Sequence, residues 1–555
     1  MAFNSFQYAA FLALVVFGYW ALPRHPRKLL LLSASYVFYA WVDVRFTAIL
    51  MATTLIDFGV ARWMGRSADP RLRRLLLTVS VGSNLLTLAF FKYFDWFRVP
   101  VETALETIGF NEPRVALVVV LPVGISFYTF STLSYTIDVY RREIEPTPSL
   151  IDFMVFISYF PHLLAGPIIR AKRMLPQIVD LPTSPKREQM REGLELIFIG
   201  LFQKVAIADA LSPATAQVFS QFGDGTGPAG PGWVNLWVAT LAAVIQFTFD
   251  FAGYSNIARG SSKLLGIELP YNFRQPLTRS RNFRDFWRRD HMTMMAWFRD
   301  YLYRPLRGRG RGWAWSAVCL CLVFALSGLW HDDGLVWLTW GFVMGGVLSI
   351  ELWVSQRADA RRRAARKAAR ARARAESDVG EAGDAGNAPG LEEGHGAVSV
   401  PVADLGGPAG TALESTKARS SLGIVRRRDR QSEELAVASV SRLPSWWPVV
   451  APVYVFIMVA VQHAWVRTGS VESSLRLYGQ LAWPRFAPID QNLLMLFAYA
   501  LFSLILLDRR EAEIERHEGK PDPLTLGRAV AYGAMVVLIV VFSGQAPVPF
   551  VYFQI

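Results

Sequence analysis

The chain has 555 residues, of which 52% are hydrophobic, 13% are aromatic and only 19% are charged. Soluble domains carry roughly 25% charged residues, so this composition excludes an ordinary soluble multidomain enzyme, and its hydrophobicity excludes a disordered protein. The net charge of +13 is not a sign of nucleic-acid binding, because Lys and Arg gather in the cytoplasmic loops of membrane proteins. The composition therefore predicts an all-α, polytopic helical membrane protein that binds no nucleic acid.

A membrane-spanning helix needs about 20 mostly apolar residues. Apolar runs that could form such helices lie near 6–22, 28–43, 46–63, 75–96, 115–138, 192–211, 233–255, 313–330, 335–354, 447–466, 491–507 and 527–544. A further run at 150–169 is interrupted by Pro161, Gly166 and Pro167, so we expect a re-entrant element that enters and leaves on one side. Basic loops mark the cytoplasmic side. The apolar runs and the positions of the basic loops together predict 12 membrane crossings with both ends of the chain outside.

The segment 357–436 separates two membrane parts, which we place at 1–356 and 437–555. Its first 18 residues, 357–374, include nine Lys or Arg interleaved with Ala, and this part could form a basic helix on anionic lipid. The remainder is rich in Gly, Ala, Glu, Ser and Pro and cannot bury enough apolar surface to order itself. We therefore favour a disordered, solvated cytoplasmic loop over a functional module.

Ionisable groups at membrane depth are costly and suggest function. His331 lies between two apolar runs whose other ends are both basic, which places it at the tip of a hairpin away from the cytoplasm. A histidine can take up and return a proton near neutral pH, as a general base must. The alternative is a loop histidine in contact with water or lipid headgroups.

Three further candidates follow from the same reasoning. His291 falls in the apolar stripe of an expected amphipathic interfacial helix over 284–302, where a buried core histidine is the alternative. Asp250 lies inside an apolar segment, where it either lines a water-filled cavity or, as we favour, forms a structural pair with an arginine. His162 lies in the broken run and is either a ligand contact or part of a simple kink. The two cysteines, Cys319 and Cys321, lie in an apolar run, and no Cys/His cluster suits a metal.

Six motifs occur in a fixed order along the chain. They are LPVGISFYTF at 121–130, SYTIDVY at 134–140, FPHLLAGPIIR at 160–170, DFAGYS at 250–255, the segment 286–306 and LSGLWH at 326–331. Each motif is weak alone, but their order over the whole chain apart from the insert resembles the membrane-bound O-acyltransferase family. The resemblance is greatest to its bacterial branch of alginate O-acetyltransferases and D-alanyl transfer proteins.

The resemblance implies a helical bundle around a central funnel, with His331 as the catalytic histidine and His291 as the second histidine. It also points to Asp250, His162, Trp330, Asp332 and Asp290 as residues that bind substrate or line the tunnel. Three positions depart from the family pattern: Asp290 stands where tryptophan is usual, Asp332 where a small residue is usual, and His162 where glutamine is usual. The two aspartates leave the chemistry in place but put the identity of the acceptor in doubt.

The predicted reaction is transfer of an acyl group, most simply acetyl, across the inner (plasma) membrane. A cytoplasmic thioester, acetyl-CoA or an acyl-carrier protein, would be the co-substrate, and no cofactor would be bound. The acceptor would be a hydroxyl of an extracytoplasmic polysaccharide or of a relay or esterase-like protein. A transporter or flippase that forms no bond, and a scaffold that recruits other enzymes, are the alternatives. A new ester formed from purified donor and acceptor would exclude a transporter or flippase. Loss of function without His331 would exclude a scaffold.

The composition of the insert generates a first prediction. Replacing residues 360–430 by a short flexible linker should leave acyl transfer largely intact, because polar loops tolerate such changes. The measurement is ester formation by the deletion variant relative to the full chain at equal expression. Loss of activity in a well-expressed variant would instead make the insert a docking site for a donor carrier or for lipid.

Overall fold

The computed structural model describes residues 1–107, 120–164, 166–222, 231–332, 334–384, 446–516 and 525–544. These residues form helices and connecting loops with no strand, which confirms the all-α prediction for the described part of the chain. The chain divides into two compact units, Met1–Ser349 with Val449–Ile555, and Ile350–Pro448. In the second unit, residues 350–384 continue helix α17 (Leu335–Asp384). The rest of the predicted insert, 385–436, lies outside the described residues.

Membrane-spanning character is clear from helix length and hydropathy. Seven helices of the described residues qualify, at Val44–Arg66, Pro70–Phe94, Trp233–Leu264, Trp313–His331, Leu335–Ala365, Val449–Val466 and Gln491–Ala512. Two shorter apolar helices are Phe6–Ala21 and Gly527–Ser543. The polytopic fold class is therefore confirmed. The count of 12 crossings stays a prediction, in part because the run at 115–138 begins outside the described residues.

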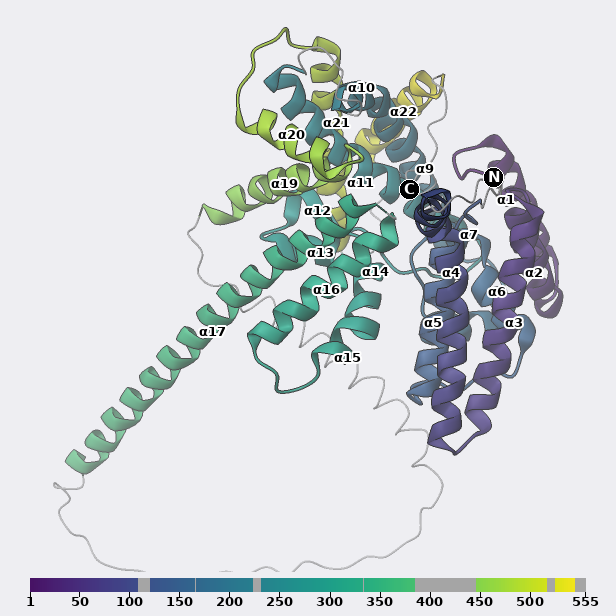
Figure 1. Ribbon diagram of the computed structural model, residues 1–555, viewed down its shortest axis with the longest axis horizontal. Coiled ribbons are helices and arrows are strands. Elements are labelled where there is room, and N and C mark those ends of the chain that lie inside the picture. The colour runs from purple at the N-terminus through teal and green to yellow at the C-terminus, as the bar shows by residue number, and fades with distance from the viewer. Residues whose placement is uncertain are drawn as a thin grey trace, which may run out of the picture. The chain divides into compact units, whose positions relative to one another are not determined.

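The N-terminal part of the first unit packs around a core rich in aromatic residues. Its helices are α1 (Phe6–Ala21), α2 (Arg24–Ala40), α3 (Val44–Arg66), α4 (Pro70–Thr107), α5 (Ile125–Tyr140), α6 (Leu150–Ser158), α7 (Phe160–Leu163) and α8 (Ala171–Val179). Helices α2 to α5 lie side by side (Figure 1). The chain breaks between α6 and α7 next to Pro161, as the sequence predicts. The backbone N–H of Phe160 donates to Ser35 Oγ at 3.1 Å, so protein satisfies the broken backbone.

The next helices cross through glycine contacts. They are α9 (Arg187–Leu201), the π-helix η1 (Phe202–Asp209), α10 (Ala210–Phe219), the 3-10 turn η2 (Ser220–Phe222) and α11 (Trp233–Leu264). Gly193 faces the carbonyl of Gly260, and Gly200 faces the carbonyl of Gly253, so a Cβ on any of the four would clash. Helices α9 and α11 therefore approach backbone to backbone, as small residues allow in membranes.

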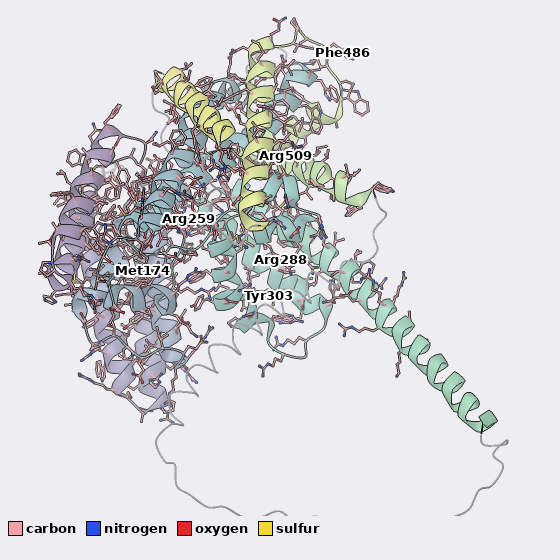
Figure 2. All side chains as sticks on the ribbon, turned by 180° about the vertical axis from the view of Figure 1, so that it is seen from behind. Met174, Arg259, Arg288, Tyr303, Phe486 and Arg509 are labelled. Atoms are coloured by element: carbon pink, nitrogen blue, oxygen red, sulfur yellow. The ribbon has the colours of Figure 1, made fainter. Side chains whose placement is uncertain are left out.

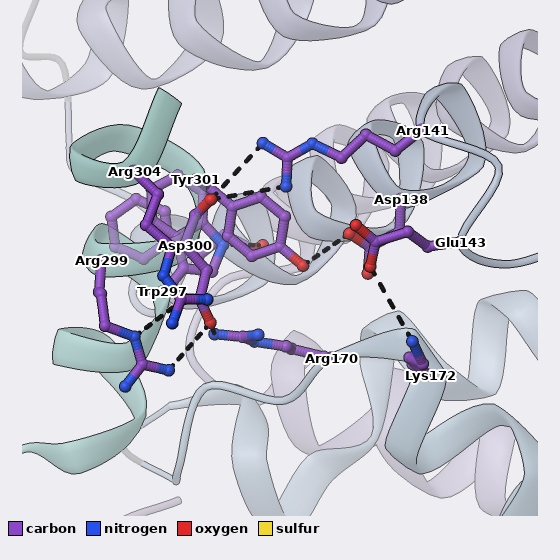
Figure 3. A network of polar contacts seen from close by, with 11 residues as sticks. Asp138, Arg141, Glu143, Arg170, Lys172, Trp297, Arg299, Asp300, Tyr301 and Arg304 are labelled. Atoms are coloured by element: carbon purple, nitrogen blue, oxygen red, sulfur yellow. Dashed lines mark hydrogen bonds and ion pairs between the residues drawn. The ribbon is translucent and has the colours of Figure 1, made fainter. Parts of the chain in front are cut away.

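A polar cluster fixes the segment that follows α11. This segment comprises α12 (Pro276–Arg279), α13 (Phe283–Arg289), α14 (Met292–Trp297), the π-helix η3 (Phe298–Tyr303) and α15 (Arg304–Arg307). In Figure 3 the Asp300 carboxylate pairs with Arg170 at 2.8 Å, and the Tyr301 hydroxyl donates to Asp138 at 2.9 Å. Trp297 Nε1 donates to the carbonyl of Phe130 at 2.9 Å. Helix α5 and the residue that precedes α8 thereby anchor η3 and, through it, the residues just before it.

The hairpin of α16 (Trp313–His331) and the first part of α17 is also built on glycine. A Cβ on Gly328 would meet the carbonyl oxygen of Trp337, and one on Gly341 would meet that of Phe324, both closer than 3.0 Å. Gly341 and Gly345 form the small-xxx-small pattern of close helix pairs. The remaining helices are α19 (Trp447–Val466), α20 (Val471–Ala482), α21 (Gln491–Arg516) and α22 (Leu526–Ser543).

The hairpin contacts predict a position-dependent effect of alanine. Gly341→Ala should destabilise the protein by about 1–3 kcal/mol, because the methyl group overfills a backbone contact. Gly346→Ala on the same helix is the matched control, since nothing lies within 4 Å of its Cβ position. Thermal unfolding of the detergent-solubilised variants measures both. Equal melting temperatures for the two variants would contradict this account of the hairpin.

Candidate active site

A cavity of about 40 Å³ in the first unit collects side chains from both parts of the chain that flank the insert. Its walls come from α11, α13, α14, α17 and α19, from the last residue of α16, and from the turn before α14. Most wall residues are apolar or aromatic. The polar residues of the wall are Thr248, Trp287, Asp290, His291, Trp337, Trp340, His331, Gln462 and His463. The two histidines of the predicted catalytic pair are thus brought together, although 39 residues separate them in the sequence.

His331 is the last residue of α16 and is only 6% exposed. Its ring stacks on Trp337 with centroids 5.0 Å apart and meets the edge of Trp340 at 5.9 Å. These aromatic contacts fix the plane of the imidazole. The position at the tip of the α16–α17 hairpin agrees with the sequence prediction.

A lysine from α4 caps the end of α16. Lys92 Nζ donates to the carbonyl oxygens of Trp330 and, at 2.7 Å, of His331, and the neighbouring Tyr93 hydroxyl donates to that of Leu329 at 2.7 Å. The last carbonyls of a helix lack intrahelical partners and attract cations. Lys92 therefore holds the backbone that carries His331 in place.

His291 does not lie on a continuous amphipathic helix, so the interfacial helix predicted over 284–302 is wrong. Helix α13 ends at Arg289, and His291 adopts φ 40° and ψ 47° as the N-cap of α14. A non-glycine residue in this left-handed region stores about 1–3 kcal/mol of strain. Asn272, on the loop after α11, compensates because its side chain and backbone bond the strained turn. These long-range contacts override the helical periodicity of the sequence.

The bonds to Asn272 also determine the tautomer of His291. Asn272 Oδ1 accepts the backbone N–H of Thr293 at 3.2 Å and the Thr293 hydroxyl at 2.8 Å. A backbone N–H can only donate, so this atom is the amide oxygen, and His291 Nδ1, 3.2 Å away, must donate to it. Burial lowers the pKa of His291 to about 3, so the ring is neutral, with Nε2 carrying the lone pair.

Asp290 lines the same cavity and is 8% exposed. Burial raises the pKa of Asp290 to about 7. A buried carboxyl of this kind can lose or hold its proton near neutral pH.

The other predicted tunnel residues lie outside the lining of this cavity. Trp330 packs between the two histidines, with ring centroids 4.6 Å from His331 and 6.1 Å from His291. Asp332 is the C-cap of α16 and is partly exposed. His162 is buried in α7, where its Nε2 lies 3.0 Å from the carbonyl oxygen of Phe156. The tunnel-lining roles of these three residues stay predictions.

Asp250 takes part in a buried ion pair. Lys204 Nζ lies 2.5 Å from Asp250 and 2.8 Å from Asp209, and the lysine side chain is 1% exposed. The glycine crossing of α9 and α11 makes this approach possible, since Gly253 contacts the backbone of Lys204. The structural pairing favoured from the sequence is present, but the partner is a lysine and not the arginine expected from the sequence. Asp250 lines neither the cavity that contains the two histidines nor the larger cavity next to it.

Sequence reasoning missed Lys92, Lys204, Gln462 and His463. Each lies in an apolar run that was recognised as a span: 75–96, 192–211 or 447–466. The rule that ionisable groups at membrane depth suggest function singles out three of the four. Lys92, Lys204 and His463, however, each contact residues on helices far away in the sequence.

A second, larger cavity of about 890 Å³ adjoins the first at Thr248, which lines both. Its basic wall residues are Arg173, Arg191, Arg259, Lys263, Arg510 and Arg528. Arg259, labelled in Figure 2, is 6% exposed, and its guanidinium lies 3.9 Å from the ring centroid of Tyr271. Phe273 lines this cavity and also stacks near the His291 ring at 6.4 Å.

Comparison with known proteins identifies the family. Residues 30–368 match the membrane-bound O-acyltransferase family. The chain belongs to this family. The match covers every motif quoted above and both histidines of the predicted pair, so the resemblance inferred from the sequence and the assignment to the acyltransferases are confirmed.

Three relatives show the range of the family near this chain. A probable alginate O-acetylase of Azotobacter vinelandii is 36% identical over 342 residues, which is 61% of this chain and 66% of the relative. A peptidoglycan O-acetyltransferase of Helicobacter pylori is 32% identical, over 61% of this chain and 68% of the relative. A teichoic acid D-alanyltransferase of Streptococcus thermophilus is 29% identical, over 42% of this chain and 58% of the relative. The chain thus matches about two thirds of the length of its O-acetyltransferase relatives.

The buried carboxyl of Asp290 generates a prediction about stability. Because its folded pKa of about 7 exceeds the unfolded value near 4, ionisation destabilises the folded protein increasingly between about pH 4 and pH 7. Asp290→Asn removes this cost, so it should raise the melting temperature more at pH 8 than at pH 5. A gain that is equal at the two pH values would show that Asp290 does not titrate in this range.

Proposed function

We propose that this protein is an O-acyltransferase that moves an acetyl group from a cytoplasmic thioester to a hydroxyl on the other side of the membrane. The observation that supports this most is the convergence of His291 and His331 on one cavity with Asp290. Two imidazoles in one small, largely apolar enclosure are suited to proton transfer, because little water competes for the proton.

The larger cavity supports a thioester donor. The orientation predicted from the basic loops places this cavity on the cytoplasmic side of the membrane. Its wall carries six basic side chains and five carboxylates, and two of the basic residues, Lys263 and Arg510, pair with Glu192 and Glu195. Phosphate groups of coenzyme A, or of the phosphopantetheine arm of a carrier protein, bind such side chains. Its contact with the smaller cavity at Thr248 would bring the thioester end of the donor close to the histidines.

The reaction then follows from general-base chemistry. His331 takes the proton of the acceptor hydroxyl while the oxygen bonds to the acyl carbon, the carbon–sulfur bond breaks, and the proton passes to the departing thiolate. His291, held with Nε2 as an acceptor by Asn272, orients or relays this proton. Base catalysis of this kind contributes roughly 10²–10⁴-fold, and the alignment of both reactants contributes more.

The acceptor class is inferred from the relatives, which are named for alginate, peptidoglycan and teichoic acid. We infer a hydroxyl of an extracytoplasmic polysaccharide, reached directly or through a relay or esterase-like protein. On this proposal the protein is a multi-pass protein of the inner (plasma) membrane. Its donor is acetyl-CoA or an acyl-carrier protein.

The test uses purified protein with radiolabelled acetyl-CoA and a mannuronate oligosaccharide. His331→Ala should lower ester formation by about 10²–10⁴-fold, although the variant still folds and is expressed. His25→Ala, at an exposed position on α2, is the matched control and should have no effect. Wild-type rates in His331→Ala would contradict the catalytic assignment. Uptake of donor or glycan into vesicles without any ester would identify a transporter instead.

A further inference from the structure

Helix α19 brings a polar face to the active-site cavity from beyond the insert. Val459, Gln462, His463 and Val466 all line the cavity. Their spacing of three and four residues places them on one face of the helix. The family match ends at residue 368, so no motif of the matched segment assigns a role to Gln462 or His463.

Hydrogen bonds fix the end of α19 next to the α16–α17 hairpin that carries His331. Trp465 Nε1 lies 3.2 Å from the carbonyl oxygen of Val336 and 3.2 Å from Thr339 Oγ1, both near the start of α17. Just past the helix, Arg467 donates to Gln246 Oε1 on α11 at 2.8 Å. The His463 ring packs on Phe247 of α11, with centroids 4.6 Å apart. Contacts with two other cavity helices thus set the position of His463.

Three polar atoms of cavity-lining residues are buried and have no hydrogen-bond partner within the described residues. They are Trp287 Nε1, Gln462 Oε1 and His463 Nε2. Folded proteins satisfy nearly all buried polar atoms, and each exception costs about 1–3 kcal/mol. Three such atoms in the wall of one cavity are typical of a binding site for a small polar group. A volume of about 40 Å³ holds roughly three water-sized groups, which suits a hydroxyl and its carbon but no sugar ring.

We propose that His463 and Gln462 bind the acceptor, with His463 holding the hydroxyl that His331 deprotonates. This inference rests on the proposed acyltransferase function and adds a residue that contacts the substrate. A hydroxyl oxygen has two lone pairs and one proton. It accepts from Trp287 Nε1–H and from His463 Nε2–H, and its own proton goes to His331. Gln462 Oε1 accepts from a second hydroxyl of the acceptor.

The experiment measures the kinetics of acetyl transfer from acetyl-CoA to a mannuronate oligosaccharide. His463→Leu should raise the KM for the oligosaccharide about tenfold, the value of one lost hydrogen bond, and leave the KM for acetyl-CoA within about twofold. His463→Gln, which keeps a donor at a similar place, should recover most of the loss. His25→Leu is the control for the same substitution at an exposed site.

Rescue by Gln together with the change in acceptor KM is a result that a merely structural role would not give. An unchanged acceptor KM in His463→Leu, or an equal rise in the KM of both substrates, overturns the proposal. If His463→Leu does not fold, Gln462→Leu takes its place with the same expected selectivity. A hydrolysis rate of acetyl-CoA that falls while the acceptor KM stays constant would show that the site holds water instead, and this also overturns it.

The two proposals fail in different ways. If the wild-type protein forms no ester with these substrates, the proposed function fails before any variant is made. Binding of the mannuronate oligosaccharide to wild-type and His463→Leu protein, measured by calorimetry without donor, then still tests the site. Equal affinities overturn the role of His463 independently of catalysis.

Discussion

Polar groups that are buried at membrane depth must find their partners inside the protein, and the arrangement of this chain depends on that constraint. Lys204 is held between Asp209 and Asp250, Lys92 caps the carbonyls at the end of α16, and Asn272 satisfies the strained turn at His291. The contacts of Lys204 with Asp250 and of Lys92 with the end of α16 join helices that are distant in the sequence. Because the helices can approach only through glycine at their crossings, the small residues and the polar pairs together position the cavity.

In the wall of the cavity, some buried polar atoms have no hydrogen-bond partner among the described residues. His291 and His331 are supported from outside by Asn272 and by the aromatic rings of Trp337 and Trp340, so their imidazoles have defined planes. In the wall of the same cavity, Gln462 Oε1 and His463 Nε2 are buried and have no partner among the described residues, and the cavity is large enough for a hydroxyl. Several unpartnered polar atoms gathered around one small cavity are the arrangement expected of a substrate site.

The sequence predicts the class of fold, most of the spans, the break near Pro161 and the pairing of His331 with His291. These features follow from local composition or from short motifs. It does not predict the turn at His291, because Asn272 stabilises a backbone conformation that the apolar periodicity of 284–302 contradicts. Nor does it place His463, since only tertiary packing shows that a span after the insert faces the hairpin that carries His331. For Asp250, the sequence predicts that the carboxylate forms an ion pair. It does not predict that the partner is Lys204 on the π-helix η1.

An experimental structure of the protein in lipid nanodiscs, with a mannuronate oligosaccharide and an acetyl-CoA analogue that cannot transfer its acyl group, would be the most direct test. The account predicts density for an acceptor hydroxyl within hydrogen-bond distance of His463 Nε2 and of His331, with the thioester end of the donor beside them. An oligosaccharide bound away from these histidines, or a His463 ring that faces lipid, would contradict it.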